Sequence, residues 1–305
     1  MKILLVNVDS KIPNLALEKL RVYHEQQGDK VYQIKDRSLL PFIDAYDKIY
    51  VSCVFDYNKH RCKKWEGIAE IGGSGYSLKK YLPTEIEKIK PKINLGFTTR
   101  GCIRNCFFCI VPKKEGKIRV VGDIYDLWDG QTKDIIIMDN NILAASEHFF
   151  KISGQLKKEN LRVDFNQGLD HRLLTDEICN ELFSLKHRYQ IRFAFDDVSY
   201  KKSVNKALKM LKRNGLKKGQ TRWYVYVGIK DTVETVLERV NILRDVDQLV
   251  FIMRDRNRKV QINQEFMKIY VWSSCIALYS TEAYYSPAVL SYFSKQKINN
   301  RPKLF

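Results

Sequence analysis

The stretch from Thr98 to Gly116, TTRGCIRNCFFCIVPKKEG, holds three of the chain's seven cysteines. Cys102, Cys106 and Cys109 lie within eight residues, with a gap of three residues and then a gap of two. Thiolates this close in sequence are typical ligands of metals and iron–sulfur clusters. Gly101 precedes the first cysteine, and glycine allows a backbone to approach a bound group closely. The loop is therefore a candidate metal centre.

The number of cysteines favours an iron–sulfur cluster over structural zinc. A zinc site uses four protein ligands, usually as two short pairs. This loop supplies three, and the remaining cysteines stand alone in the sequence: Cys53, Cys62, Cys179 and Cys275. A cubane cluster held by three thiolates leaves one iron open to a substrate or cofactor. A zinc loop stays an alternative.

Residues 1–90 are predicted to form a small three-layer α/β domain. KILLVNV reads as a buried strand, LALEKLRVYHEQQGD as a helix that ends at Gly28, and KVYQI and YDKIYVSCVF as further strands. Strands with such continuous apolar runs are typical of a parallel sheet covered by helices on both faces. The stretch IGGSGYS, residues 71–77, is either a phosphate or cofactor loop or a plain turn.

From Ile93 onward the pattern favours a parallel barrel or partial barrel. Helical stretches alternate with six apolar strands. The strands are INLGFTT, DIIIMDNN, LRVDFNQG, QIRFAFDD, RWYVYVGI and QLVFIMRDR. In such folds, functional residues collect at the carboxyl ends of the strands. Those ends hold residues 98–101, 139–141, 166–170, 196–197, 228 and 254–256.

The predicted fold class is α/β, with three parts. Residues 1–90 form a flavodoxin-like (Rossmann-type) domain, residues 91–258 a partial (β/α)6 TIM-type barrel, and residues 259–305 an aromatic extension that packs on the barrel.

The charge of the chain is concentrated in its last third. The net charge is +18, and residues 200–305 carry 21 Lys and Arg against 8 Asp and Glu. Such an excess raises the affinity for nucleic acid or other polyanions. Basic residues recur near helical spacing in one predicted helix: Lys201, Lys202, Lys206, Lys209, Lys212 and Arg213. A backbone-tracking face for nucleic acid and a solvated helix surface are both consistent with this pattern.

The expected compartment is the cytoplasm. No stretch approaches the length of apolar sequence needed for a membrane span, and the start, MKILLVNVDSK, does not resemble a secretory signal. An odd number of irregularly spaced cysteines also fits a reducing compartment better than a disulfide framework.

The cysteine stretch resembles a known signature. The segment CIRNCFFC, which follows the strand INLGFTT, is similar to the cluster loop of the radical S-adenosylmethionine (radical SAM) superfamily. The stretch CFFCIVP and the order of domains resemble the group that contains the methylthiotransferases and the enzymes with an N-terminal cobalamin-binding domain. The resemblance covers residues 93–258, and the domain order extends it to the N-terminus.

The resemblance implies a cofactor set and a chemistry. Cys102, Cys106 and Cys109 would ligate a 4Fe-4S cluster, whose open iron binds the amino and carboxylate groups of SAM. One electron, from a flavodoxin or ferredoxin type of partner, would then split SAM into methionine and a 5'-deoxyadenosyl radical. Phe108 would pack beside the cluster and the adenine.

The same resemblance assigns SAM contacts at four strand ends. In MDNN, Asp139 and Asn140 would accept hydrogen bonds from the SAM amino group. Gln167 or Arg172 would hold the SAM carboxylate or ribose. Two further strand-end residues are candidates: Asp196 for ribose or substrate, and Gly228 as the glycine against which adenine lies.

The chain departs from its apparent relatives in the N-terminal domain. Methylthiotransferases carry three more cysteines there, whereas this chain has only Cys53 and Cys62, with His60 between them. The loop after the first strand, NVDSKIPNLAL, lacks the histidine that ligates cobalt in many cobalamin-dependent members. Cobalamin held without a protein ligand stays open.

The predicted function is therefore reductive cleavage of SAM, followed by hydrogen abstraction or methyl transfer on an unidentified substrate. The basic last third makes nucleic acid or a nucleotide the leading substrate class. Two alternatives stay open: a cobalamin-dependent methylase of a peptide or small metabolite, and a non-catalytic metal-containing protein that binds nucleic acid.

Overall fold

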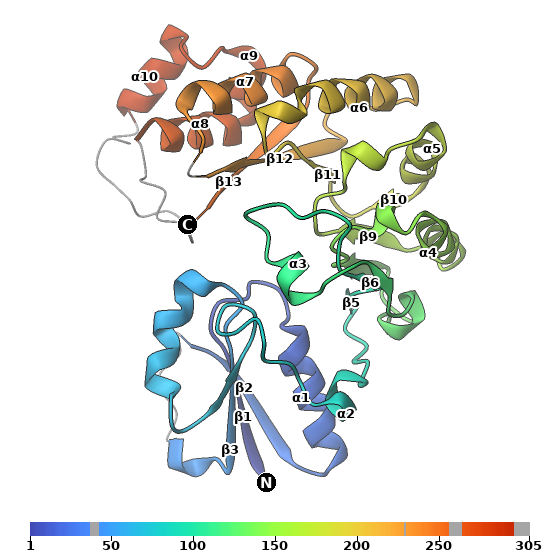
Figure 1. Cartoon of the computed structure of the whole chain (residues 1–305), viewed down its shortest axis with the longest axis vertical. Coiled ribbons are helices and arrows are strands. Elements are labelled where there is room, and N and C mark those ends of the chain that lie inside the picture. Colours follow the sequence, from blue (N-terminus) through green and yellow to red (C-terminus); the bar gives the residue numbers. More distant parts are fainter. Residues whose placement is uncertain (37–42, 229, 256–263, 296–305) are drawn as a thin grey trace. The chain divides into compact units, whose positions relative to one another are not determined.

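The computed structural model describes residues 1–36, 43–228, 230–255 and 264–295 (Figure 1). The chain divides into two compact units, residues 1–140 and 141–305, and each is described by itself below. Two predictions fall in part outside the described residues: the strand end at Arg256, and the extension at residues 259–263 and 296–305.

A parallel sheet of four strands forms the centre of the first unit. The strand order is β2-β1-β3-β4, and the bounds are β1 (Lys2–Asn7), β2 (Lys30–Lys35), β3 (Lys48–Ser52) and β4 (Glu70–Gly72). Helix α1 (Leu15–Gln26) connects β1 to β2, and the side chain of Asn14 caps it by accepting a hydrogen bond from Leu17 N.

Strand β1 has no exposed face, which explains its unbroken apolar sequence. Successive side chains of a strand point to opposite faces of the sheet. Leu4 and Val6 pack with Trp65 of the 3₁₀ helix η2 (Asp56–Trp65), whereas Ile3 and Leu5 pack with residues of α1. Both faces are therefore covered, so the prediction of a parallel α/β domain is confirmed.

The remainder of the first unit carries short elements around the cysteine loop. Strand β5 (Leu95–Gly96) pairs in parallel with β8 (Asp134–Ile137), and β6 (Thr99–Arg100) pairs antiparallel with β7 (Arg119–Val120). The helical elements are η1 (Ile43–Ala45), α2 (Thr84–Glu87), α3 (Val111–Lys114) and η3 (Ile124–Asp126).

The second unit is also built on parallel strands. Strand β9 (Arg162–Phe165) pairs with β10 (Lys186–His187), and a separate sheet has the order β11 (Ile191–Ala194), β12 (Thr221–Val227), β13 (Leu249–Arg254). The first helices of this unit are η4 (Ile142–Ala144), α4 (Ser146–Lys158), η5 (His171–Leu173), α5 (Asp176–Ser184), η6 (Val198–Tyr200), α6 (Lys201–Arg213) and α7 (Val233–Arg244).

Three more helices follow β13: α8 (Gln264–Ser274), α9 (Ile276–Thr281) and α10 (Pro287–Lys295). They are held together by aromatic packing, with Trp272 edge-on to Tyr279 and Tyr284. The hydroxyl of Tyr279 lies 2.9 Å from the carbonyl oxygen of Gln248, and Arg244 donates to Tyr279 O at 2.7 Å. These bonds attach the aromatic segment to α7 and to the start of β13.

All six strands predicted after Ile93 occur in the structure, and helices α4, α5, α6 and α7 lie between successive strands from β8 to β13, as the predicted alternation requires. Within the described residues these strands belong to separate sheets, and no barrel is seen. The domain boundaries predicted after residues 90 and 258 stay predictions. Among the helices that the structure describes, none has the length and apolar character needed to cross a bilayer.

Candidate cysteine loop and strand-end site

The cysteine loop leaves and rejoins the first unit through a two-stranded ribbon. Strands β6 and β7 form its base, and Cys102 N donates to Gly116 O at 3.1 Å, so the ends of the loop are held together. Gly101 has a φ of +87°, and a side chain there would place its Cβ 2.2 Å from the carbonyl oxygen of Lys117. Only glycine fits this turn, which places the first cysteine just beyond the ribbon.

Two residues of the predicted SAM segment hold the start of this loop. Asp139, buried after strand β8, accepts hydrogen bonds from Thr98 N and Thr98 Oγ1, both at 2.6 Å. Asn140 Oδ1 accepts from Gly101 N at 3.0 Å. Burial raises the pKa of Asp139, against the opposing effect of the bonds from Thr98. Thr98 was predicted as one of the strand-end residues 98–101, but its bonds to Asp139 were not.

Loss of the Asp139 carboxylate is expected to destabilise the loop. Asp139→Ala would leave the buried Thr98 amide without its acceptor, at a cost of about 1–3 kcal/mol in the free energy of unfolding. Urea unfolding measures this, with Asp44→Ala, at an exposed aspartate of the same unit, as control. Equal stability of both variants would contradict the role of Asp139. Its predicted contact with SAM stays a prediction.

Backbone amides point at two of the three loop sulfurs. Cys102 Sγ accepts from Arg104 N at 3.3 Å, and Cys109 Sγ accepts from Val111 N at 3.5 Å. Cys109 N donates in turn to Cys106 O at 3.0 Å. Hydrogen bonds to sulfur favour the thiolate, and they tune the reduction potential of an iron–sulfur cluster. Two backbone amides of this loop are therefore in position to donate to cluster-bound sulfur.

Exposure separates the loop thiols from three others in the chain. Cys102, Cys106 and Cys109 are partly exposed, whereas Cys53, Cys62 and Cys179 are buried. Burial raises the pKa of Cys53, and it raises that of Cys179 to about 11. Because the thiolate is the metal ligand, the partly exposed loop is the better site. The buried thiols act as small apolar core residues.

Apolar residues are the sequence neighbours of the loop cysteines. Ile103, Phe107 and Ile110 are all exposed, while Phe108, in the predicted cluster-packing position, is half-buried and lies edge-on to Phe107 with ring centroids 5.4 Å apart. Apolar surroundings limit solvent access to a bound cluster, which affects its potential.

The loop carries the residue types that a three-thiolate site requires, namely three cysteines. Within the described residues, however, no three Cys, His, Asp or Glu side chains are grouped as they would be around a bound metal ion. Metal binding would therefore require the three thiols of the loop to come together around one centre.

The other predicted site residues lie in the second unit. Arg172 donates from Nε to Asp170 Oδ1 at 2.6 Å and lies over the ring of Tyr200. Gln167, after β9, has an exposed side chain. The arginine thus already binds a carboxylate of its own chain, which orients it at the strand end.

Asp196 follows strand β11 and is the most perturbed of these groups. Its side chain is partly buried, and burial raises its pKa to about 6, although Arg239 and Arg172 favour the ionised form. A carboxyl group that titrates close to neutral pH at a strand end is a candidate for ligand binding or proton transfer.

Gly228, at the end of β12, makes room for a neighbouring aromatic ring. A Cβ at this position would lie 2.4 Å from Tyr226 Cε1 and 2.6 Å from Tyr226 Oη. That ring is fixed because Tyr226 Oη donates to Asp255 Oδ2 at 2.5 Å. The group that requires glycine here is thus a side chain of the chain itself. Contact with adenine stays a prediction.

In the N-terminal sheet, Asp9 occupies the carboxyl end of the strands. Its carboxylate accepts from Val54 N at 2.8 Å, Phe55 N at 2.9 Å and Asn58 Nδ2 at 3.1 Å. Ligands of such folds bind outside the carboxyl ends at the switch point of strand order, which here lies between β1 and β3. Asp9 was not predicted, and it already satisfies the amides that an anionic ligand would use.

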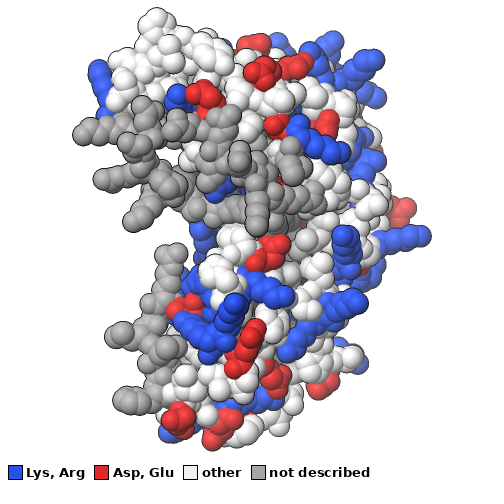
Figure 2. All heavy atoms as spheres, turned by 60° about the vertical axis from the view of Figure 1, so that its left-hand side comes forward, with Lys and Arg blue, Asp and Glu red and all other residues white. Residues whose placement is uncertain are grey.

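Helix α6 carries the predicted basic face. Its buried side chains lie on one stripe, and its basic residues are exposed; Lys201 pairs with Glu238, and Arg213 pairs with Asp176. On the face drawn in Figure 2, lysine and arginine side chains are interspersed with aspartate and glutamate. The face of α6 is thus a solvated surface with cationic groups available to a polyanion.

Comparisons with known proteins identify no family. No protein-family model matches the chain, and no curated protein matches it. Among solved structures, a D-lactate dehydrogenase from Sporolactobacillus sp. is aligned over 88% of this chain and 85% of its own, with 9% sequence identity and a TM-score of 0.24. A score this low supports no conclusion about fold or function.

Proposed function

We propose that the protein is a radical SAM enzyme, in which Cys102, Cys106 and Cys109 hold a 4Fe-4S cluster. One observation carries the proposal: three cysteines at the superfamily's spacing lie on a loop whose backbone amides donate to the sulfurs of Cys102 and Cys109. The cluster would supply the electron that cleaves SAM to a 5'-deoxyadenosyl radical, for hydrogen abstraction or methyl transfer.

The chain's own residues have two tasks in this proposal. In the first unit, Gly101, Asp139 and Asn140 keep the base of the loop closed and so support the segment whose cysteines would bind iron. In the second unit, Asp196 offers a carboxylate at a strand end for a hydroxyl or ammonium group of the bound molecule. Gln167, Arg172 and Gly228 are the proposed further contacts with SAM.

The finer architecture belongs to the same proposal. The order β2-β1-β3-β4 is that of flavodoxin-like domains, and this supports a flavodoxin-like, cobalamin-binding-like N-terminal domain. The six strands after Ile93 would correspond to a partial barrel.

Anaerobic turnover tests the proposed function. The full chain is reconstituted with iron and sulfide and mixed with SAM and dithionite, which provides the electron. We expect 5'-deoxyadenosine and methionine in equal amounts. An intact cluster that gives neither product, with or without added methylcobalamin, would contradict the proposal and favour a non-catalytic metal protein.

We further propose that the substrate is a nucleic acid or a nucleotide within one, and helix α6 provides the test. Reversal of charge at Lys206, Lys209 and Arg213, all exposed, is expected to lower RNA affinity and to reduce the slope of log affinity against log salt by about 3, since each contact contributes about one. A salt titration of RNA binding measures both.

The matched control reverses Lys157, Lys158 and Arg162, basic residues of the same unit outside α6. If both triple variants bind RNA with the same affinity and salt slope, α6 is ordinary solvated surface and the substrate class loses its support.

A further inference from the structure

A fully buried arginine lies beneath the strand ends of the second unit. Arg239 belongs to helix α7 and has 0% exposure. Burial of a guanidinium group is costly unless all its donors are paired, and burial lowers the pKa of Arg239. An arginine retained at such a position therefore needs a compensating role.

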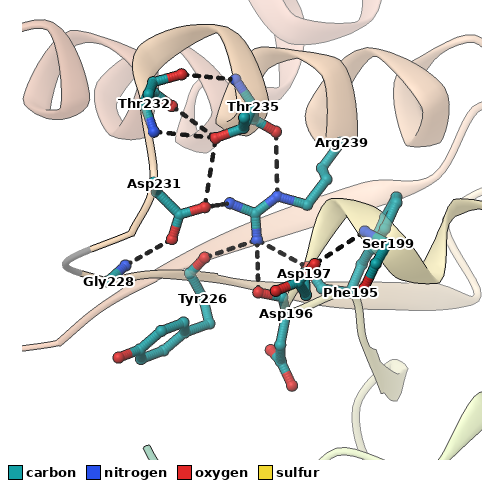
Figure 3. Close-up of polar contacts among 10 residues, drawn as sticks. All are labelled: Phe195, Asp196, Asp197, Ser199, Tyr226, Gly228, Asp231, Thr232, Thr235 and Arg239. Carbon is teal, nitrogen blue, oxygen red and sulfur yellow. Dashed lines mark hydrogen bonds and ion pairs between the residues drawn. The ribbon is translucent and has the colours of Figure 1, made fainter.

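The guanidinium group binds the ends of two adjacent strands (Figure 3). Arg239 Nη1 lies within hydrogen-bonding distance of three carbonyl oxygens: Phe195 at 3.2 Å, Asp196 at 2.9 Å and Tyr226 at 2.8 Å. The first two carbonyls follow β11 and the third lies near the end of β12. One side chain thus joins the backbone of both strands where they end.

A carboxylate completes the arrangement from the opposite side. Arg239 Nη2 forms an ion pair with Asp231 Oδ1, and Asp231 Oδ2 accepts from Gly228 N at 2.8 Å. The first turn of α7 supports Asp231, because Thr235 Oγ1 lies 3.4 Å from Asp231 Oδ1. Arg239 and Asp231, together called the clamp, therefore fix both the Asp196 carbonyl and the Gly228 amide.

The clamp directs the Asp196 side chain outward. In Figure 3 the Asp196 carboxylate points away from the guanidinium, although the carbonyl of the same residue is bound by it. The charge of Arg239 is engaged by Asp231 and by backbone oxygens, so it does not form an ion pair with the Asp196 carboxylate within the described contacts. The carboxylate stays available to a ligand.

We propose that Arg239 and Asp231 are positioning residues that aim the Asp196 carboxylate and hold the Gly228 amide for a bound SAM molecule. This inference rests on the proposed function. The clamp acts through the backbone: it touches no ligand, and it keeps the Asp196 carboxylate and the Gly228 amide in one fixed arrangement.

Anaerobic equilibrium dialysis with radiolabelled SAM, on the reconstituted full chain, tests the clamp. Arg239→Lys removes the multiple parallel donors, and Asp231→Asn removes the charge but keeps an oxygen for Gly228 N. In each variant we expect the SAM dissociation constant to rise at least about tenfold, as is typical of residues that orient ligands. Iron and sulfide content should stay unchanged, because the cysteines lie in the other unit.

The matched controls are Lys218→Arg and Asp247→Asn, which alter an exposed Lys–Asp pair of the same unit. Both should bind SAM as the wild type does. If Arg239→Lys does not fold, Asp231→Asn alone decides.

A double-mutant cycle distinguishes positioning from plain stabilisation. If the clamp acts in part through Asp196, adding Asp231→Asn to Asp196→Asn should weaken SAM binding by less than Asp231→Asn does in the wild type. Full additivity, or wild-type affinity in a folded clamp variant, would overturn the inference while leaving the proposed function intact. Absence of SAM binding by the wild type would overturn both.

Discussion

Replacement of Cys106 by alanine is expected to reduce 5'-deoxyadenosine formation to the background of a sample without protein. The loop offers three thiolates, so the variant would retain two, too few to hold a cubane cluster with a single open iron. Cys102→Ala and Cys109→Ala should give the same loss. The sulfurs of Cys102 and Cys109 accept hydrogen bonds from Arg104 N and Val111 N, so each of these variants also loses a backbone hydrogen bond within the loop.

The structure identifies the appropriate control for this experiment. Cys275 is partly exposed, as the loop cysteines are, but lies in the second unit, at the end of helix α8. Cys275→Ser should keep full iron content and full product formation. Cys179→Ser should also keep its cluster, although burial of that side chain makes some loss of stability expected.

Iron content, sulfide content and the visible absorption spectrum should be measured beside product formation. An intact cluster spectrum in Cys106→Ala would remove this residue from the ligand set. Loss of the cluster in Cys275→Ser as well would show that the readout reports general damage rather than ligation.

The parallel strands could be predicted from the sequence because a strand that is buried on both faces is apolar at consecutive positions. Strand β1 places Leu4 and Val6 on one face and Ile3 and Leu5 on the other, so four consecutive residues must be apolar. The arrangement of strands into sheets has no comparable local pattern, since pairing depends on contacts between distant residues. A barrel predicted from alternation alone therefore went beyond what periodicity supports.

The candidate site could be predicted only in part. Spacing identified the three cysteines, but nothing local indicated that Asp139 would bind Thr98, 41 residues earlier in the chain. The ribbon that closes the loop consists of strands of two residues each, too short for a period to appear. The chemical type of each side chain can be read from the sequence, whereas its hydrogen-bond partner depends on the fold.

The position of Arg239 in the sequence indicates an unusual role. It lies within the apolar stripe of helix α7, among the buried residues Val236, Val240 and Leu243. A charged residue on such a stripe contradicts the hydrophobic pattern, and positions that break a local rule are often functional. Its partners, the carbonyls at two strand ends, could be recognised only in three dimensions.

Asp196→Asn is expected to make the protein more stable near neutral pH. The pKa of Asp196 is raised from 3.8 to about 6 by burial, so the folded state binds its proton more tightly than the unfolded state does. Between those two pH values the wild type loses stability as pH rises, because ionisation costs more in the folded state. A difference of about two pKa units corresponds to roughly 3 kcal/mol, which is the upper bound on the gain at pH 7.5. Below pH 4 the gain should vanish.

The neighbouring residue provides a control of opposite sign. Burial opposes ionisation of Asp197, but hydrogen bonds from Ser199 outweigh it and hold the pKa of Asp197 below its usual value. Ionised Asp197 therefore contributes stability above its unfolded pKa, and this is lost as pH falls. Asp197→Asn should lower the free energy of unfolding at pH 7.5, measured by urea denaturation across the same pH series. A gain in both variants would contradict the assignment.

Stability and ligand binding should change in opposite directions at Asp196. A buried carboxylate that costs stability is expected where the charge serves a ligand, since stability is commonly sacrificed at functional sites. We expect Asp196→Asn to bind SAM at least about tenfold more weakly at pH 7.5, the loss of one hydrogen bond to a charged group. At pH 5, where wild-type Asp196 is largely protonated, the two proteins should bind SAM more equally. A more stable variant with unchanged SAM affinity at both pH values would mean that the carboxylate serves no SAM contact.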